Sequence, residues 1–321
     1  MLKYIVKRIL IAMALLVVMS AVTFMLMRLT PGNFLDTLRL DPQISKDTLA
    51  YYTRLYQLDA PAWQQYLHWL AGLFRGEWGY SFYYNVPVAQ IIGPRLVNTF
   101  ILSLAAFLVT WMAAIPLGIW AALNRGNGRD RALQCAAYAV ISLPGFFVAM
   151  ILLFMAAVTG CLPLGGIESP GAGELPFIAR MIDMARHLVI PVTALSLGSI
   201  AVLQKLMRGN MLEVLGRQYI FAARARGIPE DRVIYVHALR NAINPMITLL
   251  GYEFASLLSG AALMEIITSW PGLGSMMLTA VRAKDIYLVM AGMMMGGVLF
   301  VAGNLMADIA LAKADPRIKI G

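Results

Sequence analysis

The sequence predicts an all-α integral membrane protein with six transmembrane helices and a long external loop after the first. Hydrophobic residues make up 60% of the 321 positions and charged residues only 13%, which is too apolar for an ordinary soluble domain. The apolar residues also gather in long runs, and about 20 such residues in a helix cross a bilayer. Six runs qualify, at residues 9–27, 99–123, 133–159, 188–206, 245–268 and 287–312.

The first run follows Lys3, Lys7 and Arg8 and extends to Met27. A secretory signal peptide has a shorter apolar region, of about 7 to 15 residues, and ends in a small-residue cleavage site. We therefore expect the first run to be a retained transmembrane helix.

The short connections on one side of the predicted bundle carry the basic residues. Arg125, Arg129 and Arg131 follow the second run, and Lys313, Arg317 and Lys319 lie near the C-terminus. By the positive-inside rule, these loops and both termini are expected in the cytoplasm.

The external loop, residues 28–98, contains two expected helix starts, at Ser45 and at Pro61. In the second of these helices one face is apolar, made by Trp63, Leu67, Leu70 and Phe74. This face either lies on the membrane or receives a partner, or else it packs as a cap over the outer ends of the spans. We divide the chain into residues 1–97, with the first span and this loop, and 98–321, a five-helix core with a cytoplasmic loop at 208–244.

Several chemistries are excluded. The net charge of +9 comes without a groove-reading motif, so nucleic-acid binding is not expected. His68, His187 and His237 are scattered without a second ligand at metal spacing, so no metal site is expected. The chain has no phosphate-binding loop for ATP and no cluster of catalytic groups. We expect a non-catalytic protein whose energy comes from a partner.

A basic and polar stretch at residues 219–245 interrupts the apolar sequence. Alanines and large apolar residues separate its arginines, which favours short helices over a disordered tail. Gly227 is expected to end one helix, and Pro229, Glu230 and Asp231 suit the first turn of the next. Two short helices joined at this glycine make a rigid projection, which either docks a cytoplasmic protein or lies on anionic lipid.

Two acidic residues fall in the fifth apolar run. A central charge there costs on the order of 2.5 to 3.5 kcal/mol on insertion scales, so Glu253 and Glu265 are candidates for the transport pathway, or else hold structural hydrogen bonds. After them Trp270, Pro271 and Gly272 break the helix and are expected to close its outer end. Trp270 either lines a gate or marks the membrane interface.

The 219–245 stretch resembles the coupling loop, or EAA loop, of ABC-importer permeases of the dipeptide, oligopeptide and nickel family. Ala222, Ala223 and Gly227 match the alanine pair and the glycine of the family pattern, while Phe221 stands where the general pattern has glutamate. Further matches extend over nearly the whole chain, and their order indicates the B-type permease subunit: TPG at 30–32, GEWGYSF at 76–82, IPLGIWAALNRG at 115–126, ISLPGFF at 141–147, SWPGLG at 269–274 and ADPRIKI at 314–320.

The resemblance implies a type I ABC-importer permease fold in the inner membrane of a bacterium or archaeon. It implies a homologous second permease subunit, two cytoplasmic ATPases that bind ATP and Mg, and an extracytoplasmic substrate-binding protein. Peptides, nickel, oligosaccharides and other small solutes are substrates of the family. The residues expected to dock an ATPase are Ala222, Ala223, Arg224, Arg226 and Gly227. A self-sufficient secondary transporter or channel is the alternative, but it predicts paired mid-membrane charges and inverted repeats, which the sequence does not show.

Overall fold

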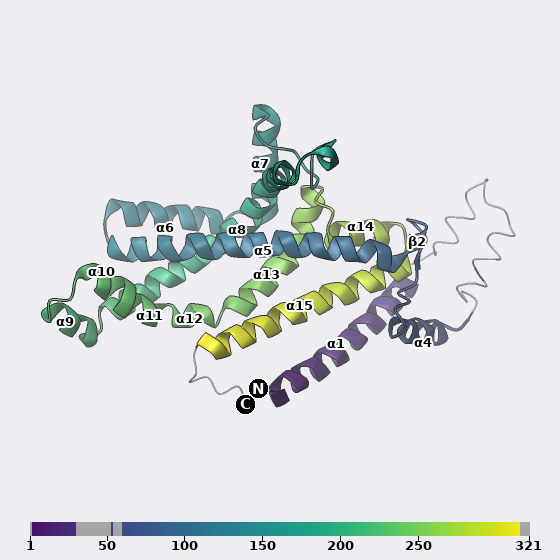
Figure 1. Ribbon diagram of the computed structural model, residues 1–321, viewed down its shortest axis with the longest axis horizontal. Coiled ribbons are helices and arrows are strands. Elements are labelled where there is room, and N and C mark those ends of the chain that lie inside the picture. The colour runs from purple at the N-terminus through teal and green to yellow at the C-terminus, as the bar shows by residue number, and fades with distance from the viewer. Residues whose placement is uncertain (1, 30–52, 54–59, 315–321) are drawn as a thin grey trace. The chain divides into compact units, whose positions relative to one another are not determined.

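The computed structural model describes residues 2–29, 53 and 60–314, and these are almost wholly helical (Figure 1). The predicted all-α membrane class is confirmed. In the described ranges five helices are long and apolar enough to cross a membrane: α1 (Leu2–Leu29), α5 (Val88–Leu123), α8 (Phe177–Leu215), α13 (Leu250–Ile267) and α15 (Ile286–Ala314). The TPG motif, the helix start at Ser45 and the basic residues Arg317 and Lys319 lie outside the described residues.

The sixth candidate span is bent. The sequence predicted one span over residues 133–159, but α6 (Gly128–Ile141) and α7 (Gly145–Thr159) meet at 100°. Pro144 accounts for the break, because it has no N–H with which to continue α6 and disfavours helical geometry at the residue before it. Its extended backbone, with φ −60° and ψ 137°, starts α7 in a new direction.

The described chain divides into two compact units. Unit 1 holds residues 99–270 and 302–314, and unit 2 holds the described residues up to 98 together with 271–301. The first boundary lies one residue beyond the division expected at 97/98. Unit 2 also takes the stretch 271–301, which the sequence placed in the five-helix core.

Unit 1 is built on the close approach of α5 and α8. A Cβ on Gly118 of α5 would lie 2.6 Å from the Cβ of Met207 and 2.8 Å from the carbonyl oxygen of Gln204. Only glycine therefore allows this spacing. The two helices frame a buried apolar core, here called the loop-side cluster, which also includes Ala114, Ile119, Leu203, Met211, Ile220, Ala223, Val233, Ile234, Ala238, Ala242 and Met246.

Short helices connect α8 to α13 in unit 1. They are α9 (Gln218–Ala225), α10 (Glu230–Arg232), the π-helical turn η2 (Val233–Ala238), α11 (Leu239–Ala242) and α12 (Asn244–Ile247), and a single turn η1 (Ala172–Glu174) precedes α8. The fifth span was expected from Pro245, but Pro245 lies in the separate helix α12 and α13 begins at Leu250. Figure 1 shows α9, α10 and α11 grouped at one end of unit 1.

Unit 2 contains α4 (Ala62–Leu73), the hairpin β1 (Tyr80–Ser81) and β2 (Val86–Pro87), and α14 (Leu273–Arg282). The sequence did not predict α14 as a helix. The hairpin is antiparallel, with Ser81 opposite Val86. It is held by Asp285, whose Oδ2 accepts hydrogen bonds from the Ser81 hydroxyl at 2.6 Å and from the Tyr83 amide at 3.2 Å.

Asp285 also orders the start of α15, because its Oδ1 accepts a hydrogen bond from the amide of Leu288 at 3.2 Å. The side chain has no exposed surface. Burial raises the pKa of this carboxyl, and the hydrogen bonds from Ser81 and from nearby backbone amides act in the opposite direction. One carboxyl group thus joins the external hairpin to the last span.

Replacing Gly118 with leucine should destabilise unit 1, because the new side chain would overlap Met207 and the α8 backbone. Overpacking of this kind costs about 1–3 kcal/mol, so the apparent melting temperature of the purified protein should fall. The matched control is Gly198→Leu on α8, where nothing lies within 4 Å of the added Cβ. Equal melting temperatures for the two variants would contradict the close approach.

Replacing Ser81 with alanine should loosen the hairpin, because a hydrogen bond to a charged group contributes about 1.5–3 kcal/mol. Hydrogen exchange of the amides at 80–87 should accelerate by at least about tenfold, since 1.4 kcal/mol corresponds to that factor. Ser142→Ala is the control, because that exposed hydroxyl bonds only within its own helix turn, to the carbonyl of Tyr138. Unchanged exchange in the hairpin would show that Ser81 does not hold it.

Candidate functional site

The basic stretch between α8 and α12 folds into a compact projection, here called the knob (Arg217–Ala242). It consists of α9, α10, η2 and α11 (Figure 1). The short helices expected from the sequence are present. Their outer surface contains most of the residues predicted to dock a partner.

The turn between α9 and α10 has the geometry that the sequence predicted. Gly227 has φ +72°, in the left-handed region where glycine is favoured. Its amide donates to the carbonyl of Arg224 at 2.9 Å, and the amide of Ile228 donates to the carbonyl of Ala223 at 3.3 Å. This pair of bonds is a Schellman motif. Pro229 then starts α10.

An ion pair closes the turn. The Arg224 guanidinium donates twice to the Glu230 carboxylate, from Nε at 3.1 Å and from Nη2 at 2.6 Å. This bond lowers the pKa of Glu230 and raises that of Arg224. Of the two arginines expected to dock an ATPase, Arg224 is paired with a carboxylate of its own chain, and Arg226 is exposed beside it.

The knob has an inner and an outer face. Ile220 and Ala223 are buried in the loop-side cluster, with 0% and 8% of their surface exposed. On the outer face Phe221 is 56% exposed, and Ala222 is exposed next to it. Of the five predicted docking residues, four therefore face outward or lie at the turn, and Ala223 anchors the helix from within.

Polar contacts join the knob to α8, and α8 to α6. The Nδ2 of Asn210 on α8 donates to the carbonyl of Ala242 at the end of α11, at 3.1 Å. Arg208, also on α8, makes a bidentate ion pair with Asp130 of α6 at 2.8 and 2.6 Å. Asp130 also accepts from the amide of Gly126. These bonds connect the knob to α8, and α8 to the start of α6.

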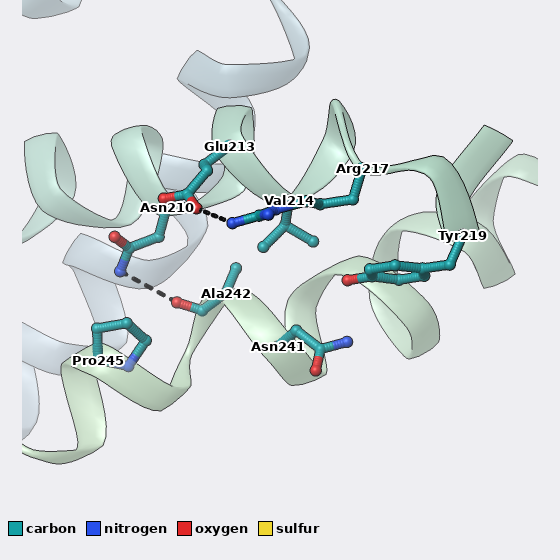
Figure 2. Close-up of a pocket in the computed structure, with 8 residues that line it drawn as sticks. All are labelled: Asn210, Glu213, Val214, Arg217, Tyr219, Asn241, Ala242 and Pro245. Carbon is teal, nitrogen blue, oxygen red and sulfur yellow. Dashed lines mark hydrogen bonds and ion pairs between the residues drawn. The ribbon is translucent and has the colours of Figure 1, made fainter.

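A pocket of about 250 Å³ lies where α8 meets the knob. Figure 2 shows the apolar side chains of Val214, Ala242 and Pro245 among polar ones, with Glu213 paired to Arg217 and the Tyr219 hydroxyl pointing toward the middle. The lining residues are Asn210, Glu213, Val214, Arg217, Tyr219, Asn241, Ala242 and Pro245.

Sequence reasoning did not single out these lining residues. They come from two segments about 30 positions apart, and only the fold of η2 and α11 against α8 brings them together. The feature of the sequence that could have indicated this pocket is the cluster of asparagine, glutamate and arginine residues just after the fourth apolar run.

The predicted pathway residues are not brought together. Glu265 is fully buried and accepts a hydrogen bond from the Thr99 hydroxyl. Glu253, twelve residues earlier on α13, is 8% exposed, and its Oε1 has no hydrogen-bond partner among the described residues. Glu265 therefore holds a structural hydrogen bond, and a pathway role for either residue stays a prediction.

The predicted helix break after Glu265 is present. Ser269 has φ +52°, and the amide of Trp270 donates to the carbonyl of Glu265 at 2.9 Å. Trp270 is fully buried in a cluster with Leu102 and Leu257, which places it in the protein core and away from the lipid interface. Pro271 and Gly272 follow and lead into α14. A gating role for these residues remains a prediction.

Comparison with known proteins identifies the family. Residues 114–320 match the family described as "Binding-protein-dependent transport system inner membrane component", and residues 1–105 match its N-terminal component. The oligopeptide transport system permease protein AppB of Bacillus subtilis is 34% identical over 98% of this chain and 99% of its own length. The dipeptide transport system permease protein DppB of Escherichia coli K12 is 32% identical over 99% of both chains.

A putative peptide transport system permease protein of Brucella abortus is 35% identical over 98% of each chain. These matches span both units, and they agree with the helical membrane architecture and with the motif order found in the sequence. The chain therefore belongs to the family of inner membrane components of binding-protein-dependent transport systems, and the predicted resemblance to ABC-importer permeases is confirmed.

Proposed function

We propose that this chain is one of two homologous permease subunits of an importer for peptides or similar small solutes. In this proposal two cytoplasmic ATPases, which bind ATP and Mg, drive the transport, and an extracytoplasmic binding protein delivers the substrate. The names of the relatives support peptides as the substrate class. The knob is the surface on which one ATPase docks.

The observation that carries the docking proposal is the division of α9 into two faces. Its inner side chains are buried among residues of α5 and α8, and its outer side chains are exposed without forming part of the core. A protein docked on the outer face therefore acts on a rigid element. In this proposal the pocket beside Tyr219 binds a side chain of the ATPase.

The same packing explains how a movement of the ATPases reaches the membrane. Packed interiors resist compression, so a displacement of α9 moves its neighbours with it. Ile220 and Ala223 would transmit it to Met207 and Met211 on α8, and the Arg208–Asp130 pair would pass it to α6. The result is a rigid-body rocking of helices that alternates access to the path.

The proposed orientation puts the knob and both termini in the cytoplasm. The bent pair α6–α7, counted as one span, leaves four spans between the N-terminus and the knob, so the two lie on the same side. The basic residues of the α5–α6 connection belong to that side as well, as the positive-inside rule requires.

Ala222 and Ala223 provide a matched pair for testing the docking face. Ala222→Leu should leave the melting temperature of the permease unchanged and should weaken co-purification of the ATPase by about tenfold or more, as for a central interface residue. Ala223→Leu should lower the melting temperature, because overpacking costs about 1–3 kcal/mol. Normal ATPase binding by a folded Ala222→Leu variant would refute docking on this face.

Gly227 tests whether the turn itself is needed for coupling. Nothing lies within 4 Å of an added Cβ, so a substitution acts through backbone strain alone. Gly227→Val should cost about 1–2 kcal/mol and abolish the ATP hydrolysis that the loaded binding protein stimulates in the assembled complex. Gly227→Asn should retain most of it, because asparagine tolerates positive φ.

Gly171→Val is the control for that experiment, because Gly171 also has positive φ and open space but lies before α8, outside the knob. The knob turn is not required if Gly227→Val and Gly227→Asn couple equally well.

A further inference from the structure

Helix α4 has three distinct faces. Gln65 and Trp69 are buried, and they define the face that packs against the rest of unit 2. Trp63, Leu67 and Phe74 are 62%, 51% and 90% exposed. At about 100° per residue these three fall within roughly 40° of arc, so they form one exposed apolar stripe.

The third face is polar and also exposed. Gln64, His68 and Ala71 lie on it. It is centred roughly 90° around the helix from the apolar stripe. The sequence predicted one apolar face on this helix, made by Trp63, Leu67, Leu70 and Phe74. Leu70 is partly buried and packs against the cluster of Phe24, Trp69 and Met290, whereas the other three side chains are exposed.

The contacts of the packed face fix the depth of α4 relative to two spans. The side chains of Phe24 on α1, Trp69 on α4 and Met290 on α15 form one buried cluster. Phe24 lies five residues before the end of α1, and Met290 four residues after the start of α15. At a rise of about 1.5 Å per residue, α4 lies roughly 6–8 Å inside both helix ends.

The ring of Tyr66 packs at the level of Phe24, and its hydroxyl reaches further along α1. Its ring lies 5.6 Å from that of Phe24, and its hydroxyl lies 2.9 Å from the Ser20 hydroxyl and 3.1 Å from the carbonyl of Val17. These partners lie in the apolar run of α1. Arg28 at the end of α1 donates a hydrogen bond to Oε1 of Gln65.

We propose that α4 is an in-plane membrane helix whose stripe Trp63, Leu67 and Phe74 inserts among the lipids of the leaflet on its side. A depth of about 5–10 Å at the boundary of headgroups and acyl chains is that of interfacial amphipathic helices, which use tryptophan, phenylalanine and leucine as anchors. With the orientation proposed above, this is the outer leaflet.

Lipid is the occupant that the geometry favours. A soluble binding protein would have to reach below the ends of the spans to cover the stripe. The polar face borders the stripe directly, as expected for a helix at the boundary between water and hydrocarbon. The end of α1, at a similar level, also exposes apolar side chains, Met25 and Leu26 at 63% and 60%.

Spin labelling tests the proposal in the assembled importer. Cys135 and Cys161, the cysteines of this chain, are first replaced by serine. Single cysteines then replace Trp63, Leu67 or Phe74, and Gln64, His68 or Ala71 serve as controls on the same helix. All six positions are exposed, so the helix itself should fold in each variant. The complex is placed in nanodiscs of phosphatidylethanolamine and phosphatidylglycerol, and collision of each label with oxygen and with a water-soluble nickel chelate is measured.

Labels on the stripe should collide often with oxygen and rarely with the nickel chelate. The ratio of the oxygen collision rate to the nickel collision rate should be several-fold higher at the stripe than at the control positions. Adding the binding protein should not change this ratio.

High nickel accessibility at the stripe would overturn the proposal in favour of an aqueous face. Low accessibility to both reagents would assign the stripe to the second permease subunit, and protection that appears only with the binding protein would assign it to that partner. The measurement needs no ATP hydrolysis, so its outcome is independent of the docking proposal.

Discussion

The contact between α5 and α8 at Gly118 is the constraint on which the rest of unit 1 depends. Because no side chain separates the helices there, Met207 packs directly on α5 and the loop-side cluster forms between their ends. That cluster in turn receives the inner face of α9. The knob is rigid because its buried half belongs to the core of the long helices, and the proposed docking of an ATPase depends on that rigidity.

The sequence predicted local features well where the backbone conformation depends on a single residue. Gly227 ends α9 and Pro229 starts α10 because their conformational preferences are strong and local. The bend at Pro144 has an equally local cause, but the continuous hydrophobicity on both sides obscured it. By contrast, the Arg224–Glu230 pair and the pocket beside Tyr219 depend on how helices pack, which periodicity does not encode.

The two acidic residues of α13 also show that the sequence pattern does not reveal contacts between helices. Hydrophobicity alone makes Glu253 and Glu265 equivalent, because each is a charge in an apolar run. In the structure Thr99 supplies a partner for Glu265, while Oε1 of Glu253 has none among the described residues. The difference arises from a residue 166 positions away in the chain, on another helix.

The bond between Ser81 and Asp285 has a consequence for biosynthesis. The two residues are 204 positions apart, and a chain that grows at about 5–20 residues per second needs roughly 10 to 40 s to make that stretch. During this interval the hairpin has already been made but lacks the carboxylate that fixes it. The N-terminal part of unit 2 can therefore reach its final packing only after the ribosome has made the beginning of the last span.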